Sequence, residues 1–280
     1  MKLSPLHDEP LVIGSGFRAH GLRASTEALD PLLMIDHFYM SAPTFGPHPH
    51  AGFSAVTYLF ADSSTGVRSR DSSGDDSLIH PGDAHWMVAG RGMVHDEMPQ
   101  VFGKVVHGLQ LFVRLAAKDQ FCAPHPLKIR RAQMPRPQQG HHQITVAWGQ
   151  YDDGVQQSRC PVAVPTPHTL LDIKLAADAP FVYPLPRGQH NILLLIEGAA
   201  EVNGHAMQAP QACTAEGDSL ELRTTTAAQV VLLMGMPLRE PVFQHGPFAL
   251  GTRAQVVQAI HDYQAGKMGH LESIHTEASK

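Results

Sequence analysis

Two short motifs carry the residues best suited to chemistry: His48-Pro49-His50 and His95-Asp96-Glu97. In an extended strand, alternate side chains point to the same face, so each motif directs two metal-binding side chains to one side. Together the motifs offer three imidazoles and one carboxylate, a donor set that suits Fe, Ni, Co, Mn, Cu or Zn. We therefore predict a metal site, provided that the fold brings the two motifs together.

The histidine content of the chain weakens any single spacing as evidence. With 19 histidines, His-x-His spacings arise by chance, and a lone one is usually a surface or hydrogen-bonded histidine. Two features favour a metal site here. Both motifs lie among strand-like, glycine-rich segments, and they flank a hairpin-rich stretch long enough to fold back on itself. Spacing alone leaves both interpretations, metal ligands and ordinary histidines, open.

Composition indicates a β-rich globular chain. Its 280 residues are 43% hydrophobic, enough for a sizeable core and one or two domains. Charged residues make up only 17% of the chain, whereas there are 24 glycines and 22 prolines. This balance favours many short strands joined by tight turns over long surface helices.

Charge and hydropathy argue against several classes of partner. The net charge is -5 and the chain has no run rich in lysine or arginine, so we expect no direct nucleic-acid binding. No apolar run approaches the ~20 residues of a membrane span, and the first residues lack the apolar region of a signal peptide. Three widely spaced cysteines predict reduced thiols: Cys122, Cys160 and Cys213. We therefore expect a cytoplasmic protein with no membrane association.

The strand-like segments fall into two runs separated by a connector. The first run includes 55–60 and 108–115, and the second of these alternates as a half-buried strand does. Residues 116–140 are rich in Pro, Gln, Arg and Lys, which is typical of a boundary, and a second run opens at 143–149. We predict an N-terminal domain over residues 1–130 and a C-terminal domain over residues 131–280.

The two halves share a faint repeat. The apolar segment 58–62 leads to a Gly-Asp turn at 81–83, and the segment 194–198 leads, after a similar gap, to another at 216–218. The pattern suggests a duplicated β-unit. Because the second copy has neither the His-x-His nor the His-x-Glu spacing, we expect only the first half to hold a metal.

The tail predicts one helix. Thr252 and Gln255 have the spacing of a capping box, and Gly266 is placed to end the helix. Three apolar residues fall on one helix face: Val256, Ile260 and Tyr263. We expect this helix to dock on the rest of the chain.

Several longer motifs resemble those of the pirin family, a branch of the cupin superfamily. They are HPHAGF at 48–53, the run WMVAGRGMVHDEMP at 86–99, GLQL at 108–111, PLREP at 237–241 and GPF at 246–248. The resemblance covers nearly the whole chain, and the run at 86–99 is long and specific.

The resemblance implies an all-β fold of two antiparallel cupin β-barrels, a bicupin, with a C-terminal helix. It also implies one divalent metal ion in the N-terminal barrel, with Fe(II) as the first candidate and Ni, Co, Mn, Cu or Zn as alternatives. The family's four ligands fall on His48, His50, His95 and Glu97, the same set that the spacing selects. The C-terminal barrel is implied to lack metal.

Pirin-family members act as quercetin 2,3-dioxygenases in bacteria and as metal-dependent transcription co-regulators in animals. The first activity implies a small aromatic substrate, a flavonol or similar enolisable compound, which a metal ion would bring together with O2. The alternative is a non-enzymatic, metal- or redox-responsive regulator that binds a protein partner. A structural zinc site ranks last, because such sites favour cysteine and no cysteine lies near the motifs.

The sequence departs from the family's usual HPHRGFE motif at two positions. Ala51 stands where the family has arginine, and Ser54 where it has glutamate. Ser54 does not ionise at neutral pH and cannot be a carboxylate base. Three sources of basicity stay open: the metal alone, Glu97 acting as base as well as ligand, or a histidine such as His85 or His107.

Overall fold

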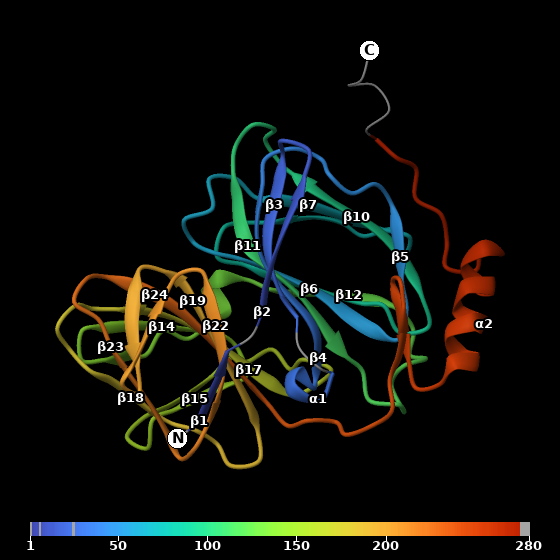
Figure 1. The fold of residues 1–280 in the computed structure, drawn as a ribbon. Coiled ribbons are helices and arrows are strands. Elements are labelled where there is room, and N and C mark those ends of the chain that lie inside the picture. The colour runs from blue at the N-terminus through green and yellow to red at the C-terminus, as the bar shows by residue number, and fades with distance from the viewer. Residues whose placement is uncertain (1, 6, 24–25, 275–280) are drawn as a thin grey trace. The chain divides into compact units, whose positions relative to one another are not determined.

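The computed structural model describes residues 2–5, 7–23 and 26–274. Strands dominate these residues (Figure 1), which also form two α-helices, α1 (Thr26–Leu29) and α2 (Arg253–Gln264), and one 3-10 helix, η1 (Arg131–Gln133). The all-β class with a C-terminal helix, predicted from the sequence, is confirmed.

The chain forms two compact units, each assembled from segments distant in sequence. What we call the C-terminal unit comprises Met1–Glu9, Leu22–Pro31 and Ile129–Leu238. The N-terminal unit comprises Pro10–Gly21, Leu32–Lys128 and Arg239–Lys280. The sequence predicts one division, between residues 130 and 131, whereas in the structure the segment Met1–Glu9 belongs to the C-terminal unit and the segment Arg239–Lys280 to the N-terminal unit. Such an exchange depends on tertiary pairing, which local sequence patterns do not encode.

The N-terminal unit contains a seven-stranded and a four-stranded sheet, and every strand pairing that we describe in them is antiparallel. The larger sheet has the order β12 (His125–Ile129), β9 (Ala84–Val88), β6 (Phe53–Leu59), β11 (Val106–Arg114), β4 (Leu32–Met40), β3 (Phe17–Arg23) and β2 (His7–Ile13). The smaller has the order β5 (His48–His50), β10 (Met93–Pro99), β7 (Val67–Asp71) and β8 (Asp76–Ile79). A hairpin of β25 (Phe243–His245) and β26 (Phe248–Leu250) completes the unit.

The C-terminal unit repeats this plan of seven and four strands. Its larger sheet has the order β1 (Lys2–Pro5), β22 (Gln211–Glu216), β19 (His190–Glu197), β24 (Ala228–Gly235), β17 (His168–Leu175), β14 (His142–Trp148) and β13 (Gln138–Gln139). Its smaller sheet has the order β18 (Phe181–Pro184), β23 (Ser219–Arg223), β20 (Ala199–Val202) and β21 (His205–Gln208). A hairpin of β15 (Gln150–Asp152) and β16 (Gln157–Arg159) is added. The two units thus share one strand plan, as the duplicated β-unit suggested. The two Gly-Asp turns are not equivalent within it, because 81–83 precedes β9 whereas 216–218 follows β22, the counterpart of β9.

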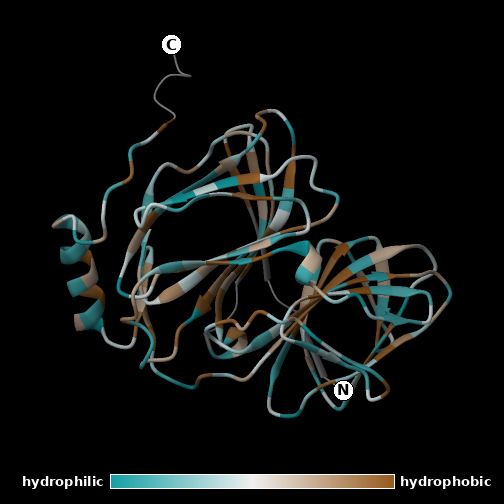
Figure 2. Cartoon of the chain, turned by 180° about the vertical axis from the view of Figure 1, so that it is seen from behind, coloured by the Kyte–Doolittle hydropathy of each residue, from teal (hydrophilic) through white to brown (hydrophobic). Residues whose placement is uncertain are grey.

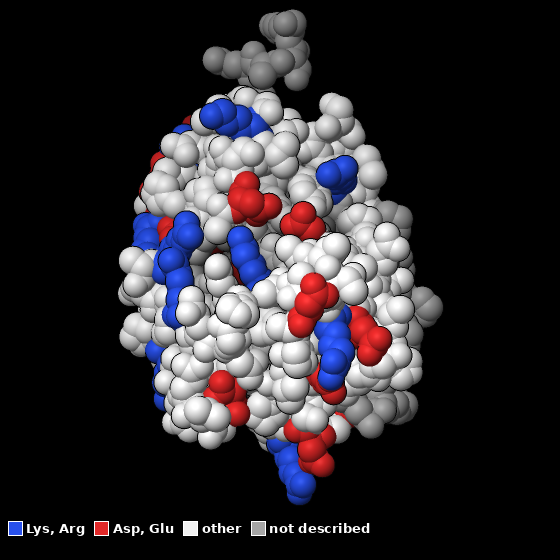
Figure 3. Space-filling view, turned by 90° about the vertical axis from the view of Figure 1, so that its left-hand side faces the viewer, with Lys and Arg blue, Asp and Glu red and all other residues white. Residues whose placement is uncertain are grey.

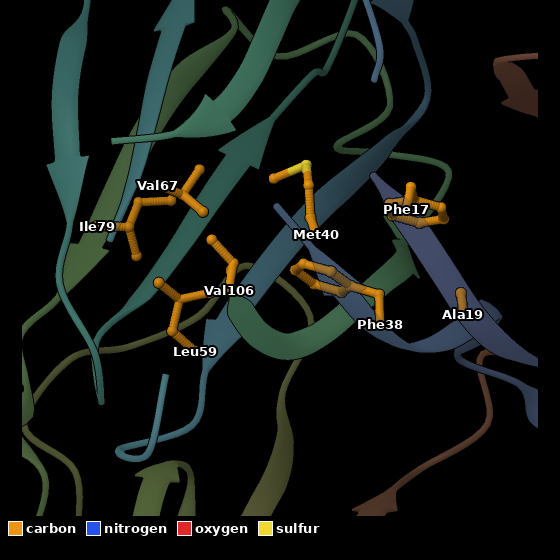
Figure 4. Close-up of a cluster of buried hydrophobic side chains, with 8 residues drawn as sticks. All are labelled: Phe17, Ala19, Phe38, Met40, Leu59, Val67, Ile79 and Val106. Atoms are coloured by element: carbon orange, nitrogen blue, oxygen red, sulfur yellow. The ribbon is translucent and has the colours of Figure 1, made fainter. Parts of the chain in front are cut away.

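An apolar cluster joins the two sheets of the N-terminal unit. Figure 4 shows Val67 and Ile79, from the smaller sheet, facing side chains of the larger sheet such as Leu59 and Val106. The remaining members of this buried cluster come from β3 and β4: Phe17, Ala19, Phe38 and Met40. Since burying each large apolar side chain contributes about 1.5–3 kcal/mol, this cluster holds the two sheets together.

Helix α2 packs against the β25–β26 hairpin and reaches Val94 of β10. Thr252 caps it by accepting a hydrogen bond from the Gln255 N–H at 3.2 Å, and Gly266 follows its last turn with φ of +73°. Apolar and polar residues alternate along the helix (Figure 2), and its buried side packs on Ala51, Val94 and Phe248. The helix predicted from the capping motif is therefore present and docked.

None of the helices in the described part of the chain is long and apolar enough to cross a bilayer. On the face in Figure 3, acidic and basic side chains are interspersed.

Candidate metal centre

Strand pairing brings the two histidine motifs together. β5 and β10 run antiparallel, with His95 opposite His48 and Met93 opposite His50. The ligand nitrogens of His48, His50 and His95 all lie within 4.8 Å of one another, and the Nε2 atoms of His48 and His95 are 3.1 Å apart. The intervening Val94 points to the other face, into the cluster under α2. Alternation along two paired strands thus explains the convergence.

The local surroundings fix the orientation of the three imidazoles. Nδ1 of His48 donates to the carbonyl of Gly46 at 2.9 Å, which leaves the Nε2 lone pair of a neutral ring facing His95. The His50 ring packs against Phe53 and Phe112, whose centroids are each 5.1 Å away and whose rings also contact each other. On the other side, the ring of Phe45 lies 6.3 Å from that of His48. Aromatic side chains therefore flank the histidines on two sides.

Burial keeps the imidazoles neutral at physiological pH. Burial, and after it the neighbouring His48, lower the pKa of His50 to about 3. Burial and the other histidines lower the pKa of His95 well below its usual value. The pKa of His48 is also lowered by burial, although the Gly46 carbonyl opposes the shift. Neutral imidazoles have free lone pairs, so this donor set fits a divalent transition-metal ion.

Glu97 shares a strand face with His95 but lies outside the three-histidine group found among the described residues. Its Oε1 accepts a hydrogen bond from the Thr57 hydroxyl at 2.7 Å. Burial raises the pKa of the Glu97 carboxyl to about 7; the Thr57 hydrogen bond lowers it, and the Asp96 charge raises it further. The structure thus places Glu97 on the strand face of His95, where it is held by Thr57, a partner that the sequence motifs do not indicate.

The two departures from the family motif both face away from this centre. Ala51 packs under α2 with Phe248, and its N–H and carbonyl bond to the backbone of the β25–β26 hairpin. Ser54 lies three residues from Thr57 on β6. This strand pairs with β11 and β9 without a register shift, so Ser54 points to the opposite face. Neither substitution removes a side chain from the face that the histidines share.

The two alternative bases lie on different faces. His85 is in register with Thr57, so it shares the face of the metal centre, and its Nε2 lies 3.8 Å from a carboxylate oxygen of Asp75. On β11, Gln110 is the register partner of Thr57 and faces the same side. His107 lies three residues from Gln110 and therefore points to the opposite face. There its Nδ1 donates to Asp62 at 2.9 Å, and its Nε2 lies 2.8 Å from Nε2 of His37. His107 is therefore not placed to act at the histidine cluster.

Sequence reasoning missed three residues of the site: Thr57, Gln110 and Phe112. All lie within strands that the sequence predicts. The available signal was the polarity of Thr57 and Gln110, each of which has an apolar neighbour on either side in its strand. Which of them face the histidines depends on sheet register, which the sequence leaves unspecified.

Family models match both halves of the chain. Residues 14–113 match the model described as Pirin, and residues 170–269 match the Pirin C-terminal cupin domain. The chain belongs to the pirin family. The bicupin architecture expected from the motifs is confirmed by these matches and by the solved structures described below.

Relatives of this pirin-family chain include proteins with different names. A Pseudomonas aeruginosa protein named "Putative quercetin 2,3-dioxygenase" is 35% identical over 255 residues, covering 86% of this chain and 88% of the relative. Pirin from Homo sapiens is 33% identical over 265 residues, covering 92% of this chain and 89% of the relative.

Solved structures agree on the fold. A quercetin 2,3-dioxygenase from Acinetobacter baumannii superposes with a TM-score of 0.85 at 26% identity, covering 97% of this chain and 98% of that one. The bacterial pirin YhhW from Escherichia coli, solved in complex with nickel(II), has a TM-score of 0.66 at 16% identity, covering 84% of this chain and all of that one. At that identity, the second comparison shows the fold alone.

Proposed function

We propose that this pirin-family chain is a metal-dependent dioxygenase of the quercetin 2,3-dioxygenase type. It would cleave a flavonol or similar enolisable aromatic with O2. The observation that carries the proposal is the convergence of three neutral imidazoles across β5 and β10. The name of the Pseudomonas relative and the Acinetobacter structure support it.

We assign one divalent ion, with Fe(II) as the first candidate, to His48, His50, His95 and Glu97. The three imidazoles supply neutral donors, and Glu97 supplies a carboxylate from the same strand face as His95. When bound, the ion would act as a Lewis acid and bring substrate and O2 together. Glu97 is assigned as fourth ligand because of its position two residues from His95 on β10.

The surrounding residues suit a flat aromatic substrate. Phe112 is partly buried beside His50, and Phe45 is partly exposed beside His48. Such rings orient aromatic ligands by edge-to-face and stacked contacts. The proton of the substrate hydroxyl would pass to Glu97, because His107 and Ser54 point to the opposite face. His85 shares the face of Thr57 and is the second candidate for that role.

The test is aerobic loss of quercetin absorbance by protein loaded in turn with Fe(II), Ni(II), Co(II), Mn(II) and Cu(II). We expect turnover that depends on metal and is lost in His50→Ala. The matched control is His205→Ala, which replaces an exposed histidine of the C-terminal unit and should retain turnover. Fully loaded protein that turns over quercetin with none of the metals would refute the proposal and favour a regulator that binds a protein partner. The cytoplasmic location stays a prediction.

A further inference from the structure

Three strands bring three polar side chains together beside the histidines. Thr57 on β6 and Gln110 on β11 are direct register partners within the larger sheet. Glu97 lies on β10 in the smaller sheet. The Thr57 Oγ1 lies 2.7 Å from Oε1 of Glu97 and 2.9 Å from Oε1 of Gln110. Thr57 thus links the two sheets through Glu97.

The hydrogen count at Thr57 restricts how this contact works. A threonine hydroxyl has one hydrogen to donate, whereas it can accept from other donors. It therefore cannot donate to both oxygens. If the Gln110 amide turns by 180°, its Nε2–H faces Oγ1, and the hydroxyl hydrogen is left for Glu97. Thr57 then donates in one direction only, toward the carboxylate.

We propose that Thr57, oriented by Gln110, is a positioning residue that holds Oε1 of Glu97 and so leaves Oε2 as the oxygen available to a metal ion. This inference rests on the metal site of the proposed function, but it does not depend on which reaction that site catalyses. A carboxylate held at one oxygen is pre-oriented, because it cannot rotate freely between binding one and two oxygens to the ion.

Packing alone does not account for the arrangement. Thr57 is buried in a strand whose every residue is buried, where valine would fill a similar volume without placing a hydroxyl between two polar side chains. Gln110, by contrast, is a partly buried amide on an otherwise apolar stretch of β11. Residues that orient a metal ligand do so by hydrogen-bonding to it, and Thr57 and Gln110 are placed next to Glu97 to do this.

The test compares Thr57→Val with Thr57→Ser by metal affinity, measured for Co(II) and Ni(II) by chelator competition, and by the visible absorption spectrum of the Co(II) form. We expect Thr57→Val to bind about 10–100-fold more weakly with an altered Co(II) spectrum, and Thr57→Ser to behave like the parent. The control, Thr145→Val, changes a partly buried threonine in the C-terminal unit and should leave both readouts unchanged.

A double-variant cycle separates positioning from general stability. In a Glu97→Gln background, Thr57→Val should change metal affinity by less than about twofold, because its target is gone. If Glu97→Gln abolishes metal binding, the inference is tested by the difference in metal affinity between Thr57→Val and Thr57→Ser. If Thr57→Val does not fold, Gln110→Met takes its place and should weaken binding in the same direction.

Parent-like affinity and spectrum in folded Thr57→Val, or equal losses in the valine and serine variants, would overturn the inference. Failure of the proposed function is distinguishable from these outcomes: the parent protein would then bind metal normally and not turn over quercetin.

Discussion

The buried ion pair between Arg70 and Asp96 gives the sharpest prediction about the strand that carries the candidate ligands. Asp96 lies between His95 and Glu97, on the opposite face of β10, and its side chain is 0% exposed. Arg70 on β7 is its register partner. The Arg70 Nε donates to Oδ1 at 3.0 Å, and Nη2 donates both to Oδ2 and to the Glu272 carbonyl. Replacing Arg70 with methionine therefore leaves a carboxylate buried without its cation.

The magnitude follows from that burial. Removing one partner of a buried ion pair costs about 3–5 kcal/mol, whereas replacing both by apolar residues is often neutral. Because the Arg70 side chain is 11% exposed, water can partly reach the vacated position, and we expect about 3 kcal/mol for Arg70→Met. The double variant Arg70→Met with Asp96→Leu should recover to within about 1 kcal/mol of the parent.

The assay is urea unfolding of the metal-free protein. Trp86 is buried in the N-terminal unit and Trp148 in the C-terminal unit, so a Trp148→Phe background lets fluorescence report the unit that contains Arg70. The matched control is Arg68→Met on the same strand. Its pair with Asp76 is 45% and 50% exposed, and such pairs contribute about 0–1 kcal/mol. A loss for Arg70→Met no larger than for Arg68→Met, or no recovery in the double variant, would refute the reasoning.

Two further predictions concern pH and backbone conformation. Burial lowers the pKa of His37 to about 3 from 6.5. As pH falls below 6.5, the unfolded state therefore binds a proton that the folded state does not, and stability is lost. His37→Phe should reduce the drop in unfolding free energy between pH 7.5 and pH 5 by about 2 kcal/mol, and an unchanged drop would contradict this. Gly52 has φ of +86°, and a Cβ there would lie 2.0 Å from the Ala249 carbonyl oxygen. Thermal unfolding should therefore show Gly52→Ala to be clearly less stable than Gly74→Ala, whose φ is +95° with open space around it; equal stability would show that the close approach does not matter.

The sequence predicted the histidine cluster because its chemistry is local. In a strand, residues i and i+2 point to the same face, so each motif places two side chains on one side. The structure brings three of these four side chains together: His48, His50 and His95. Helix α2 was equally predictable, since Thr252 and Gly266 mark its ends through local backbone rules.

Other features depend on pairing between strands and could not be predicted from the sequence. The faces of Ser54 and His107 follow from register, and a shift of one residue would reverse them. The role of Thr57 requires two sheets to meet at Glu97. The assignment of residues 239–280 to the N-terminal unit depends on packing of Phe248 and α2 against Ala51 and Val94, for which the sequence offers only an apolar helix face.

The central claim is that one metal ion is held by the histidines of β5 and β10. The most direct measurement is the metal content of the protein after anaerobic loading with Fe(II) and removal of free ions, for the parent and for His48→Ala, His50→Ala, His95→Ala and His205→Ala. We expect one equivalent in the parent and in His205→Ala, and well below one in the other three. Full metal content in His50→Ala and His95→Ala, with both variants folded, would contradict the account.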